Sequence, residues 1–412
     1  MKGLLVIADG LGGRPSDWGS STCIARARTP HLDKLAHGGA LGIMDPIAPG
    51  VRPGSDTSHL SIFGYDPAQV YTGRGAFEAL GIGLDVRGGD VCFRANFATV
   101  EETDGELVVR DRRAGRLAEG AELARALEDL KLGDGDVTFT FRASTEHRGA
   151  LVLRGGGLSA EVTDTDPHEE GAKVAACEPR TGSDDARRTA ELINSFSRLA
   201  HKVLRDHPVN RARREAGKPE ANALLLRGAA VMPHLPTLTE QYSVQGSCVA
   251  GGALYKGVAS AAGLEVLEVP GATGDMKTDL TAKAKAAQHA LETAGFVFVH
   301  IKGTDNAAHD GSAEEKTRFI ERIDEEFFGA LSGRLGVGDV VLCFSGDHTT
   351  PPAVGEHTAD PVPVLFWGPP IRTDATDRFD ETAAGTGGLG RFSGRLVPQL
   401  LGYCDLGAKF GA

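Results

Sequence analysis

The sequence predicts an α/β protein, in which a doubly wound, mostly parallel sheet carries a smaller inserted α+β domain. Continuous apolar runs, of which residues 3–8 are the first, are typical of strands buried on both faces. Helical stretches separate these runs, as the crossover connections of parallel strands require. Between residues 86 and 214 the strands instead alternate apolar and polar positions, which indicates a sheet of another kind. We therefore expect a core domain of residues 1–85 and 215–412 and an inserted domain of residues 86–214.

Composition narrows the class of protein. The chain has 412 residues, of which 41% are hydrophobic, and this is enough for a sizeable core in two domains. A net charge of −12 argues against nucleic acid as a partner. The six cysteines are far apart and form no Cys-x-x-Cys pair, which is typical of the reduced thiols of a cytoplasmic protein. The first apolar run is too short for a signal peptide, and no run reaches transmembrane length, so we expect no membrane partner. The sequence predicts no particular oligomeric state.

The first part of the core domain places two polar residues at the ends of buried segments. We expect a strand at residues 3–8, a helix at 29–37, a helix beginning near Ser55 and a helix beginning near Gly75. The first strand ends at Asp9, and open α/β sheets bind ligands at the carboxyl ends of their strands. Ser55 follows a Pro-Gly turn and begins a run of residues that favour a helix N-terminus. A hydroxyl there is close to free backbone N–H groups, which favour an alkoxide and attract phosphate. Taken alone, this stretch favours an ordinary N-cap over a functional serine.

The remaining elements follow the same two patterns. In the inserted domain we expect strands at 91–100, 106–113, 136–141 and 149–155 and helices at 116–130 and 184–205. In the second part of the core domain we expect strands at 223–228, 263–270, 296–305, 339–348 and 361–368 and helices at 277–293 and 313–335. Two of these strands end in charged residues, and these endings have the composition of a metal site.

Acidic and histidine residues gather at those two strand ends. Asp305 and His309 are four apart, which puts them on one face if the turn continues as a helix. Asp347 and His348 are adjacent, and His357 follows nine residues later. A single histidine is more often structural than a ligand, but this combination suits Mn²⁺, Zn²⁺ or Mg²⁺ rather than calcium. Two such ions ~4 Å apart can hold the attacking and leaving oxygens of a phosphoryl transfer.

Many ordered motifs make the chain similar to a known family. They include IADGLGG, RTPHLDKLA, PGSDTSHLSIFGYDP, YTGRGAFEALGIG, DRRAGR, DTDPH, PGATGD, VHIKGTDNAAHDG and SGDHTTPP. The chain resembles the archaeal-type, 2,3-bisphosphoglycerate-independent phosphoglycerate mutases of the alkaline phosphatase superfamily. The resemblance implies an alkaline-phosphatase-like fold and an isomerase of glycolysis and gluconeogenesis. Such an enzyme interconverts 2-phosphoglycerate and 3-phosphoglycerate through a phosphoserine intermediate.

The resemblance also implies the cofactors and their ligands. Two divalent metal ions are expected, with Mn²⁺ first and Mg²⁺, Zn²⁺ or Co²⁺ as alternatives, and no 2,3-bisphosphoglycerate is needed. One ion would be held by Asp9, Ser55, Asp347 and His348. The other would be held by Asp305, His309 and His357.

A mutase must also grip a phosphorylated substrate and keep the phosphoserine from water, and we expect the inserted domain to act as the lid. Arginine suits this purpose because it binds carboxylate and phosphate through two parallel hydrogen bonds. Candidate substrate-binding residues are Arg94, Arg110, Arg112, Arg113, His147 and Arg148, together with Arg213 near a hinge between the domains. Arg227 and Lys302, both assigned to the core domain, are candidates to hold the transferring phosphoryl group, and Asp111 is the candidate proton carrier. Any one of these arginines could instead be a solvated surface charge.

One departure from the family leaves alternatives open. The family more often has Asp-Glu-Ala-Gly-His, where this chain has Asp305, Asn306, Ala307, Ala308 and His309. The change of a neighbouring acid to an amide puts the metal preference and the substrate in doubt. A related metal-dependent phosphatase or phosphotransferase for another small ester is the second hypothesis, and a non-catalytic metal-stabilised binding module is the third. Residues 164–168 match the family without an assigned role.

Overall fold

The protein is described here from a computed structural model that covers residues 1–115, 117–133, 135–407 and 409. The chain divides into two compact units, one of Met1–Tyr71 with Leu235–Ala412 and the other of Thr72–His234. The inserted unit is therefore longer at both ends than the expected 86–214. It also contains α5 (Gly75–Gly81) and β7 (Ala223–Val231), because both pack on its long strand β3. The apolar sequence of β7 suggested a core-domain strand, but burial in the second unit produces the same pattern.

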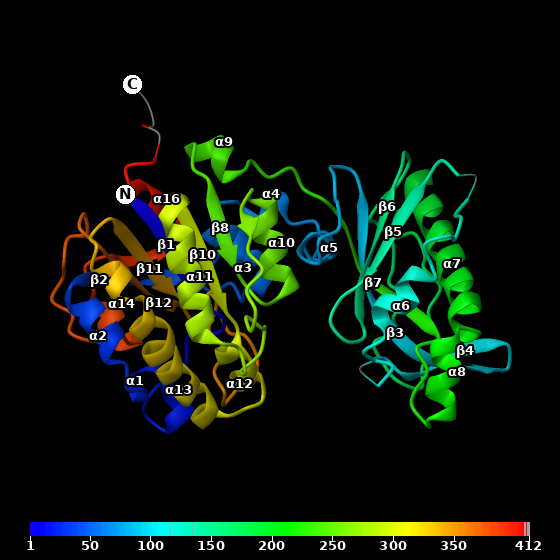
Figure 1. Ribbon diagram of the computed structural model, residues 1–412, viewed down its shortest axis with the longest axis horizontal. Coiled ribbons are helices and arrows are strands. Elements are labelled where there is room, and N and C mark those ends of the chain that lie inside the picture. Colours follow the sequence, from blue (N-terminus) through cyan, green and yellow to red (C-terminus); the bar gives the residue numbers. More distant parts are fainter. Residues whose placement is uncertain (116, 134, 408, 410–412) are drawn as a thin grey trace. The chain divides into compact units, whose positions relative to one another are not determined.

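The first unit is built on one eight-stranded sheet (Figure 1). In spatial order its strands are β13 (Gly390–Ser393), β2 (Gly39–Asp45), β12 (Val362–Trp367), β11 (Val340–Ser345), β1 (Lys2–Ala8), β10 (Phe296–Ile301), β8 (Gly246–Val249) and β9 (Glu265–Val266). The two pairings of β12 are antiparallel, and the other five are parallel. The predicted doubly wound, mostly parallel sheet is confirmed.

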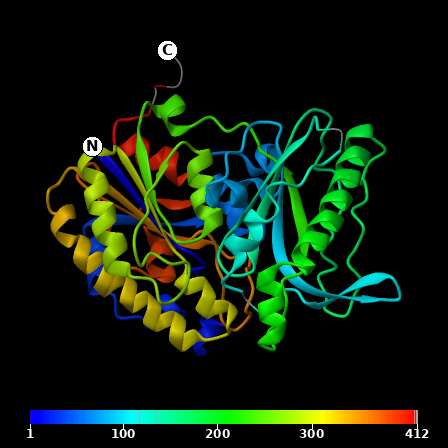
Figure 2. The same ribbon diagram turned by 45° about the vertical axis from the view of Figure 1, so that its right-hand side comes forward.

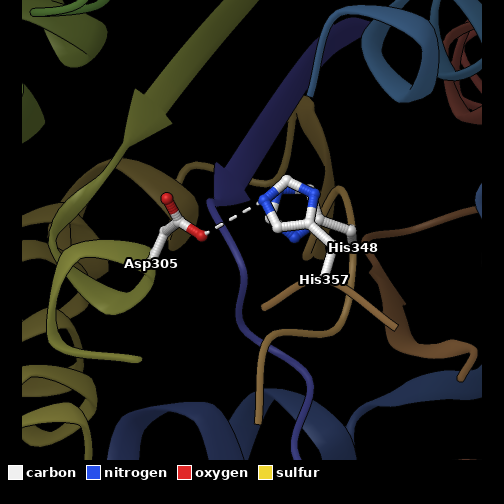
Figure 3. Close-up of side chains that lie close together, drawn as sticks. All are labelled: Asp305, His348 and His357. Carbon is white, nitrogen blue, oxygen red and sulfur yellow. Dashed lines mark ion pairs between the residues drawn. The ribbon is translucent and has the colours of Figure 1, made fainter. Parts of the chain in front are cut away.

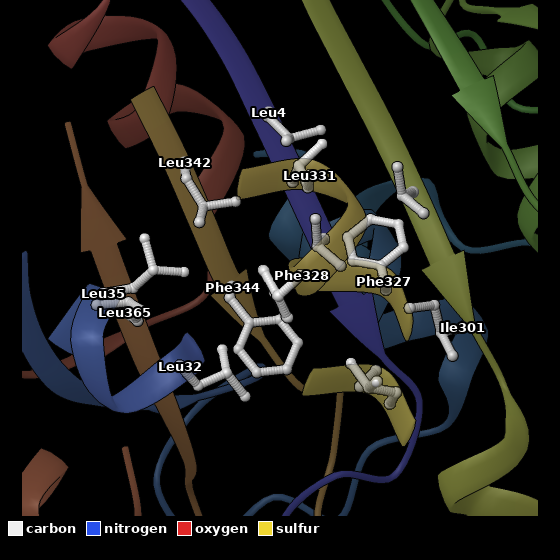
Figure 4. Close-up of a cluster of buried hydrophobic side chains, with 14 of the residues drawn as sticks. Leu4, Leu32, Leu35, Ile301, Phe327, Phe328, Leu331, Leu342, Phe344 and Leu365 are labelled. Carbon is white, nitrogen blue, oxygen red and sulfur yellow. The ribbon is translucent and has the colours of Figure 1, made fainter. Parts of the chain in front are cut away.

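Helices cover both faces of this sheet, which explains the unbroken apolar strands. One face packs against α1 (Cys23–Arg26), α2 (Pro30–His37), α11 (Leu280–Thr293), α13 (Ala313–Arg322), α14 (Gly329–Leu335) and α15 (Glu381–Thr386). The side chains on this face form a hydrophobic core. Figure 4 shows part of it, with Leu4 and Leu342 from the adjacent strands β1 and β11 beside Phe327 and Phe328. Among the described residues, this unit also contains a short 3-10 helix, Pro15–Trp18, and the α-helices α3 (Ser55–Ile62), α4 (Pro67–Val70), α9 (Leu238–Tyr242), α10 (Ala253–Ala261), α12 (Gly303–His309) and α16 (Leu396–Tyr403).

Two helices differ from the prediction for local reasons. The expected helix 313–335 is interrupted by a π-helical segment, Ile323–Phe328, which separates α13 from α14. In that segment the Asp324 carboxylate accepts hydrogen bonds from the backbone N–H groups of His31 and Leu32 at the start of α2. The expected helix 277–293 begins only at Leu280, because the side chain of Asp279 caps it.

Several short strands escaped prediction. Strands β2, β8 and β13 each contain glycine, which weakens the strand pattern. Of the expected strand 263–270, only β9 forms, at the edge of the sheet. Within the part of the chain that the structure describes, no helix is both long enough and apolar enough to cross a membrane.

The second unit contains a five-stranded antiparallel sheet. Its elements besides α5 and β7 are β3 (Val91–Thr103), β4 (Glu106–Asp111), α6 (Gly120–Arg125), β5 (Thr138–Ala143), β6 (Arg148–Arg154), α7 (Asp184–Arg205) and α8 (Pro208–Glu215). The long green helix α7 covers one face of the sheet (Figures 1 and 2), and α5 packs on the other. The predicted helix 184–205 is confirmed. The expected helix 116–130 is represented by α6, and Arg116 lies outside the described residues.

Candidate active site

Ser55 is the first residue of α3, as predicted. Gly54 before it is extended, with φ −86° and ψ 158°, so the helix begins at the serine. The Ser55 Oγ atom lies 3.2 Å from His348 Nε2. The serine is 8% exposed, so its hydroxyl is largely shielded from water while it remains close to the free N–H groups of the helix.

Asp9, Asp347 and His348 form a first group of candidate metal ligands. Their ligand atoms all lie within 4.8 Å of one another. His348 Nε2 is 3.2 Å from Asp9 Oδ1 and 3.4 Å from Asp347 Oδ2. Among the described residues, these two buried carboxylate oxygens have no hydrogen-bond donor. Two unpartnered anionic oxygens beside an imidazole nitrogen fit a divalent cation, because burial without compensation is costly.

Asp305, His348 and His357 form a second group, shown in Figure 3. Asp305 Oδ1 lies 3.8 Å from His357 Nε2 and 3.3 Å from His309 Nε2. Asp305 and His309 come from α12, so the predicted four-residue spacing does bring them together. The rings of His348 and His357 stack with their centroids 3.6 Å apart. The structure thus gathers all seven predicted residues, and it places His348 within reach of both groups rather than one.

Each histidine of these groups is oriented through its Nδ1 atom. His309 Nδ1 lies 2.8 Å from the Gly355 carbonyl oxygen, and His357 Nδ1 lies 2.9 Å from the Pro53 carbonyl oxygen. His348 Nδ1 lies 2.9 Å from Thr350 Oγ1. With Nδ1 engaged in each ring, Nε2 is the nitrogen directed toward the carboxylates, as is usual for a histidine that binds metal.

The carboxylates of Asp9, Asp305 and Asp347 are close enough for the charge of one to shift the pKa of another. Burial and the charge of Asp9 raise the pKa of Asp347 to about 7. Burial and Asp9 would also raise the pKa of Asp305, but His309 and Lys302 outweigh them and bring it to about 2. The Lys302 ammonium lies 3.0 Å from Asp9 Oδ2 and 2.7 Å from Asp305 Oδ2. The lysine therefore bridges the two ligand groups, at the end of β10 where it was expected.

Three buried aromatic side chains behind the site were not predicted. The Tyr255 hydroxyl donates a hydrogen bond to Asp9 Oδ2, and its ring stacks on His300 with centroids 3.4 Å apart. His59 Nδ1 lies 2.7 Å from the Ser55 carbonyl oxygen. Burial lowers the pKa of His59 to about 4 and that of His300 to about 3, so both rings are neutral. A histidine within an apolar strand was the signal that could have identified His300, whereas Tyr255 follows the unpredicted strand β8.

The second unit holds an arginine cluster around two acids. Arg94 Nε lies 2.9 Å from Glu78 Oε2, and Arg112 donates to Asp166 at 2.7 and 3.0 Å. Arg227 Nε lies 3.8 Å from Asp166 Oδ2, and Arg227 is the cross-strand partner of Arg94. Burial and the neighbouring Arg94 lower the pKa of Arg227. The assignment of Arg227 to the core domain was wrong, because β7 belongs to the sheet of the second unit.

The segment of residues 164–168 now has a structural role. The buried carboxylate of Asp166 accepts hydrogen bonds from the Arg112 guanidinium. Asp164 Oδ1 accepts a hydrogen bond from the Gly228 backbone N–H. The segment therefore ties β7 to the arginine that follows β4. We call Arg94, Arg112, Arg227, Glu78 and Asp166 the arginine cluster.

Other predicted substrate-binding residues lie apart from this set of contacts. Arg110 is exposed and pairs with Glu101 across the β3–β4 hairpin. Arg213 is buried in α8 of the second unit, not at a hinge, and it binds the carbonyl oxygens of Ala114 and Pro219.

Three more of these residues flank strands β4 and β6. Arg113 and Arg148 are exposed, and His147 is buried. The Asp111 carboxylate accepts hydrogen bonds from the backbone N–H groups of Arg113 and Gly115, both at 2.7 Å. These contacts orient Asp111 in the turn after β4.

Comparison with known proteins gives a consistent result. A family model described as "2,3-bisphosphoglycerate-independent phosphoglycerate mutase" matches residues 36–210. Proteins of that name from Methanopyrus kandleri and Ignicoccus hospitalis are 46% and 48% identical to this chain, cover 100% of it, and are themselves covered over 98% and 99%. The solved cofactor-independent phosphoglycerate mutase from Thermoplasma acidophilum is 37% identical, with a TM-score of 0.73, over 98% of this chain and 100% of that one. A solved protein from Pyrococcus horikoshii is 40% identical, with a TM-score of 0.85, over 100% and 99%.

Proposed function

Since the chain belongs to the 2,3-bisphosphoglycerate-independent phosphoglycerate mutases, we propose that it interconverts 2-phosphoglycerate and 3-phosphoglycerate through a phosphoserine at Ser55. The observation that supports this chemistry best is the position of the Ser55 hydroxyl. It lies at a helix N-terminus, 3.2 Å from an imidazole that is within reach of both acidic groups. The proposed nucleophile, the Ser55 hydroxyl, therefore lies where a helix N-terminus can also bind the phosphoryl anion.

The residues present fit two divalent cations. Asp9, Ser55, Asp347 and His348 would hold one, and Asp305, His309 and His357 would hold the other. When bound, the ions supply Lewis-acid stabilisation of the phosphoryl oxygens and favour the serine alkoxide. We propose Mn²⁺, with Mg²⁺, Zn²⁺ or Co²⁺ as alternatives, because the donors are mixed imidazole and carboxylate.

The chain's own groups carry out two successive transfers. Ser55 Oγ attacks the substrate phosphorus as its alkoxide, the bond from phosphorus to the glycerate oxygen breaks, and that oxygen takes up a proton from the proton carrier. The other glycerate hydroxyl then attacks the phosphoserine, loses its proton and releases Ser55. We propose Asp111 as the carrier of this proton. We propose Lys302 as the cation that neutralises negative charge on the phosphoryl group during its transfer.

The arginine cluster is our candidate for binding the substrate carboxylate. Arg94 of β3 and Arg227 of β7 are cross-strand neighbours, and the acids Glu78 and Asp166 pair with them and orient their guanidinium groups. Like charges held side by side favour an anion between them, and the planar guanidinium matches a carboxylate. Burial lowers the pKa of Arg227 most and the charge of Arg94 lowers it further, and a bound anion would oppose both effects.

The departure at Asn306 does not favour the phosphatase alternative. The Asn306 amide donates a hydrogen bond of 3.4 Å to the Gly274 carbonyl oxygen, a bond that a carboxylate could not make. The residue therefore supports the loop that contains Gly274, and Asp305 and His309 on either side keep their contact.

A coupled assay tests the proposal. The purified protein is stripped with EDTA, reloaded with Mn²⁺ and given 3-phosphoglycerate, and the 2-phosphoglycerate formed is detected with enolase, while free phosphate is measured in parallel. We expect mutase turnover without added 2,3-bisphosphoglycerate, little phosphate release, and loss of activity after stripping. Rapid phosphate release from other esters without mutase turnover would instead support the phosphatase or phosphotransferase alternative.

A further inference from the structure

Lys316 in α13 is a fully buried lysine within the first unit. Its ammonium donates to three backbone carbonyl oxygens, those of Gly10 at 2.7 Å, Gly12 at 2.8 Å and Thr350 at 2.8 Å. An ammonium has three N–H donors, so each of them has a partner. Among the described residues no carboxylate forms an ion pair with Lys316, which sets it apart from Lys302.

Burial of a charged ammonium without a carboxylate partner lowers the stability of the folded state. Burial disfavours the ammonium and lowers the pKa of Lys316, and an apolar side chain of similar volume would avoid this cost. The compensation comes from loop carbonyls, and two of the three, those of Gly10 and Thr350, have no other backbone donor among the described residues. The ammonium thus replaces hydrogen bonds that these irregular segments do not make for themselves.

The three carbonyls belong to the loops that carry the candidate metal ligands. Gly10 and Gly12 lie one and three residues after Asp9 in the loop after β1, and Thr350 lies two residues after His348 in the loop after β11. Thr350 Oγ1 also bonds to Asp305 Oδ1 at 3.2 Å.

Lys316 is itself attached to a third ligand-bearing segment. Its helix, α13, begins four residues after the end of α12, the helix that contains Asp305 and His309. One ammonium group therefore connects three segments that are distant in sequence and that together hold five of the seven candidate ligands.

From this convergence we infer that Lys316 is a positioning residue, which holds the two ligand loops and α12 in their mutual arrangement before metal binds. The inference rests on the proposed metal site. It implies that Lys316 contributes to metal affinity without touching the metal or the substrate. Supporting contacts of this kind typically change metal affinity by about 10- to 100-fold.

Binding of Mn²⁺ to metal-free protein tests the inference without relying on turnover. We would titrate the wild type, K316M and K283M by calorimetry and by the electron paramagnetic resonance signal of free Mn²⁺. Lys283 is the matched control, because it is also buried and donates to carbonyl oxygens, those of His300 and Thr273, but to neither ligand loop. We expect K316M to bind Mn²⁺ about tenfold more weakly or worse, and K283M to lose thermal stability with nearly unchanged Mn²⁺ affinity.

The remaining outcomes are each decisive. If the wild type binds no Mn²⁺, the proposed metal site fails, independently of Lys316. If K316M binds Mn²⁺ as tightly as the wild type, more tightly, or with the same loss as K283M, the positioning role is overturned. If K316M is insoluble, K316Q, which keeps an N–H donor on a shorter stem, replaces it in the comparison. If neither variant folds while K283M does, Lys316 is required for folding itself and the inference is likewise overturned.

Discussion

Ser55 Oγ and His348 Nε2 lie 3.2 Å apart, although 293 positions separate the two residues in the chain. The contact joins the start of α3 to the loop after β11. Both segments lie at an edge of the sheet where strand ends converge, which is the usual location of ligand sites in open α/β proteins.

Replacement of Ser55 by alanine should remove mutase activity by at least about a thousandfold, because it deletes the proposed nucleophile. The fold should persist, since the side chain is small and alanine can continue the helix. Ser58→Ala is the matched control, because it removes a nearby buried hydroxyl that donates to the Ser55 carbonyl oxygen. The coupled assay and melting curves give both readouts. Activity of the Ser55 variant within about tenfold of the wild type would contradict the phosphoserine route.

Replacement of Asp347 by asparagine should have opposite effects on metal-free stability and on metal binding. The folded pKa of Asp347 is raised from 3.8 to about 7 by burial and by Asp9. Its contribution to stability is therefore lost as pH rises across that window, because the folded state must give up a proton that it holds tightly. At pH 8 the metal-free variant should melt higher than the metal-free wild type, yet gain less from Mn²⁺. Equal melting temperatures for the two metal-free proteins at pH 8 would refute this account.

Metal uptake should release a proton from His309. The hydrogen bond with Asp305 raises the pKa of His309 to about 9, so without metal the ring is charged at neutral pH. A histidine binds a metal ion only in its neutral form, and Mn²⁺ affinity should therefore increase as pH rises toward that value. Calorimetry at pH 7.5 in buffers of different ionisation enthalpy measures the protons released. His309→Gln should release fewer protons than the wild type, and an unchanged number would show that His309 is not a ligand.

Replacement of Arg94 by lysine should raise KM for 3-phosphoglycerate about tenfold, because a point charge cannot reproduce the planar grip of a guanidinium on carboxylate. The value of kcat should change less, since the proposed contact is made before and during the transfer. Arg110→Lys is the control, because Arg110 is an exposed partner of Glu101 on a hairpin. If both variants show the same KM as the wild type, the arginine cluster does not bind the substrate.

Local patterns along the chain singled out the seven residues that the structure brings together, and the family resemblance assigned them to two metal ions. Asp9, Asp305 and Asp347 each follow an apolar strand, and parallel strands of one sheet bring such endings to a common edge. Ser55 was predictable because a helix N-terminus has its own signature in the Pro-Gly turn and the hydroxyl residues that follow. These inferences required only the nature of the neighbours in sequence.

Partners from other segments could not be predicted in this way. Arg227 was assigned to the wrong unit because a buried strand has the same apolar pattern in either sheet, and only its pairing with β3 distinguishes them. Lys316 is one of several charged residues in the expected helix 313–335, and nothing in the sequence singled it out, yet it is fully buried and donates to carbonyls of two distant loops. Periodicity reports which side of an element is buried, because burial acts on each residue separately. Hydrogen bonds between distant segments depend on where those segments meet, and packing decides that only once the chain has folded.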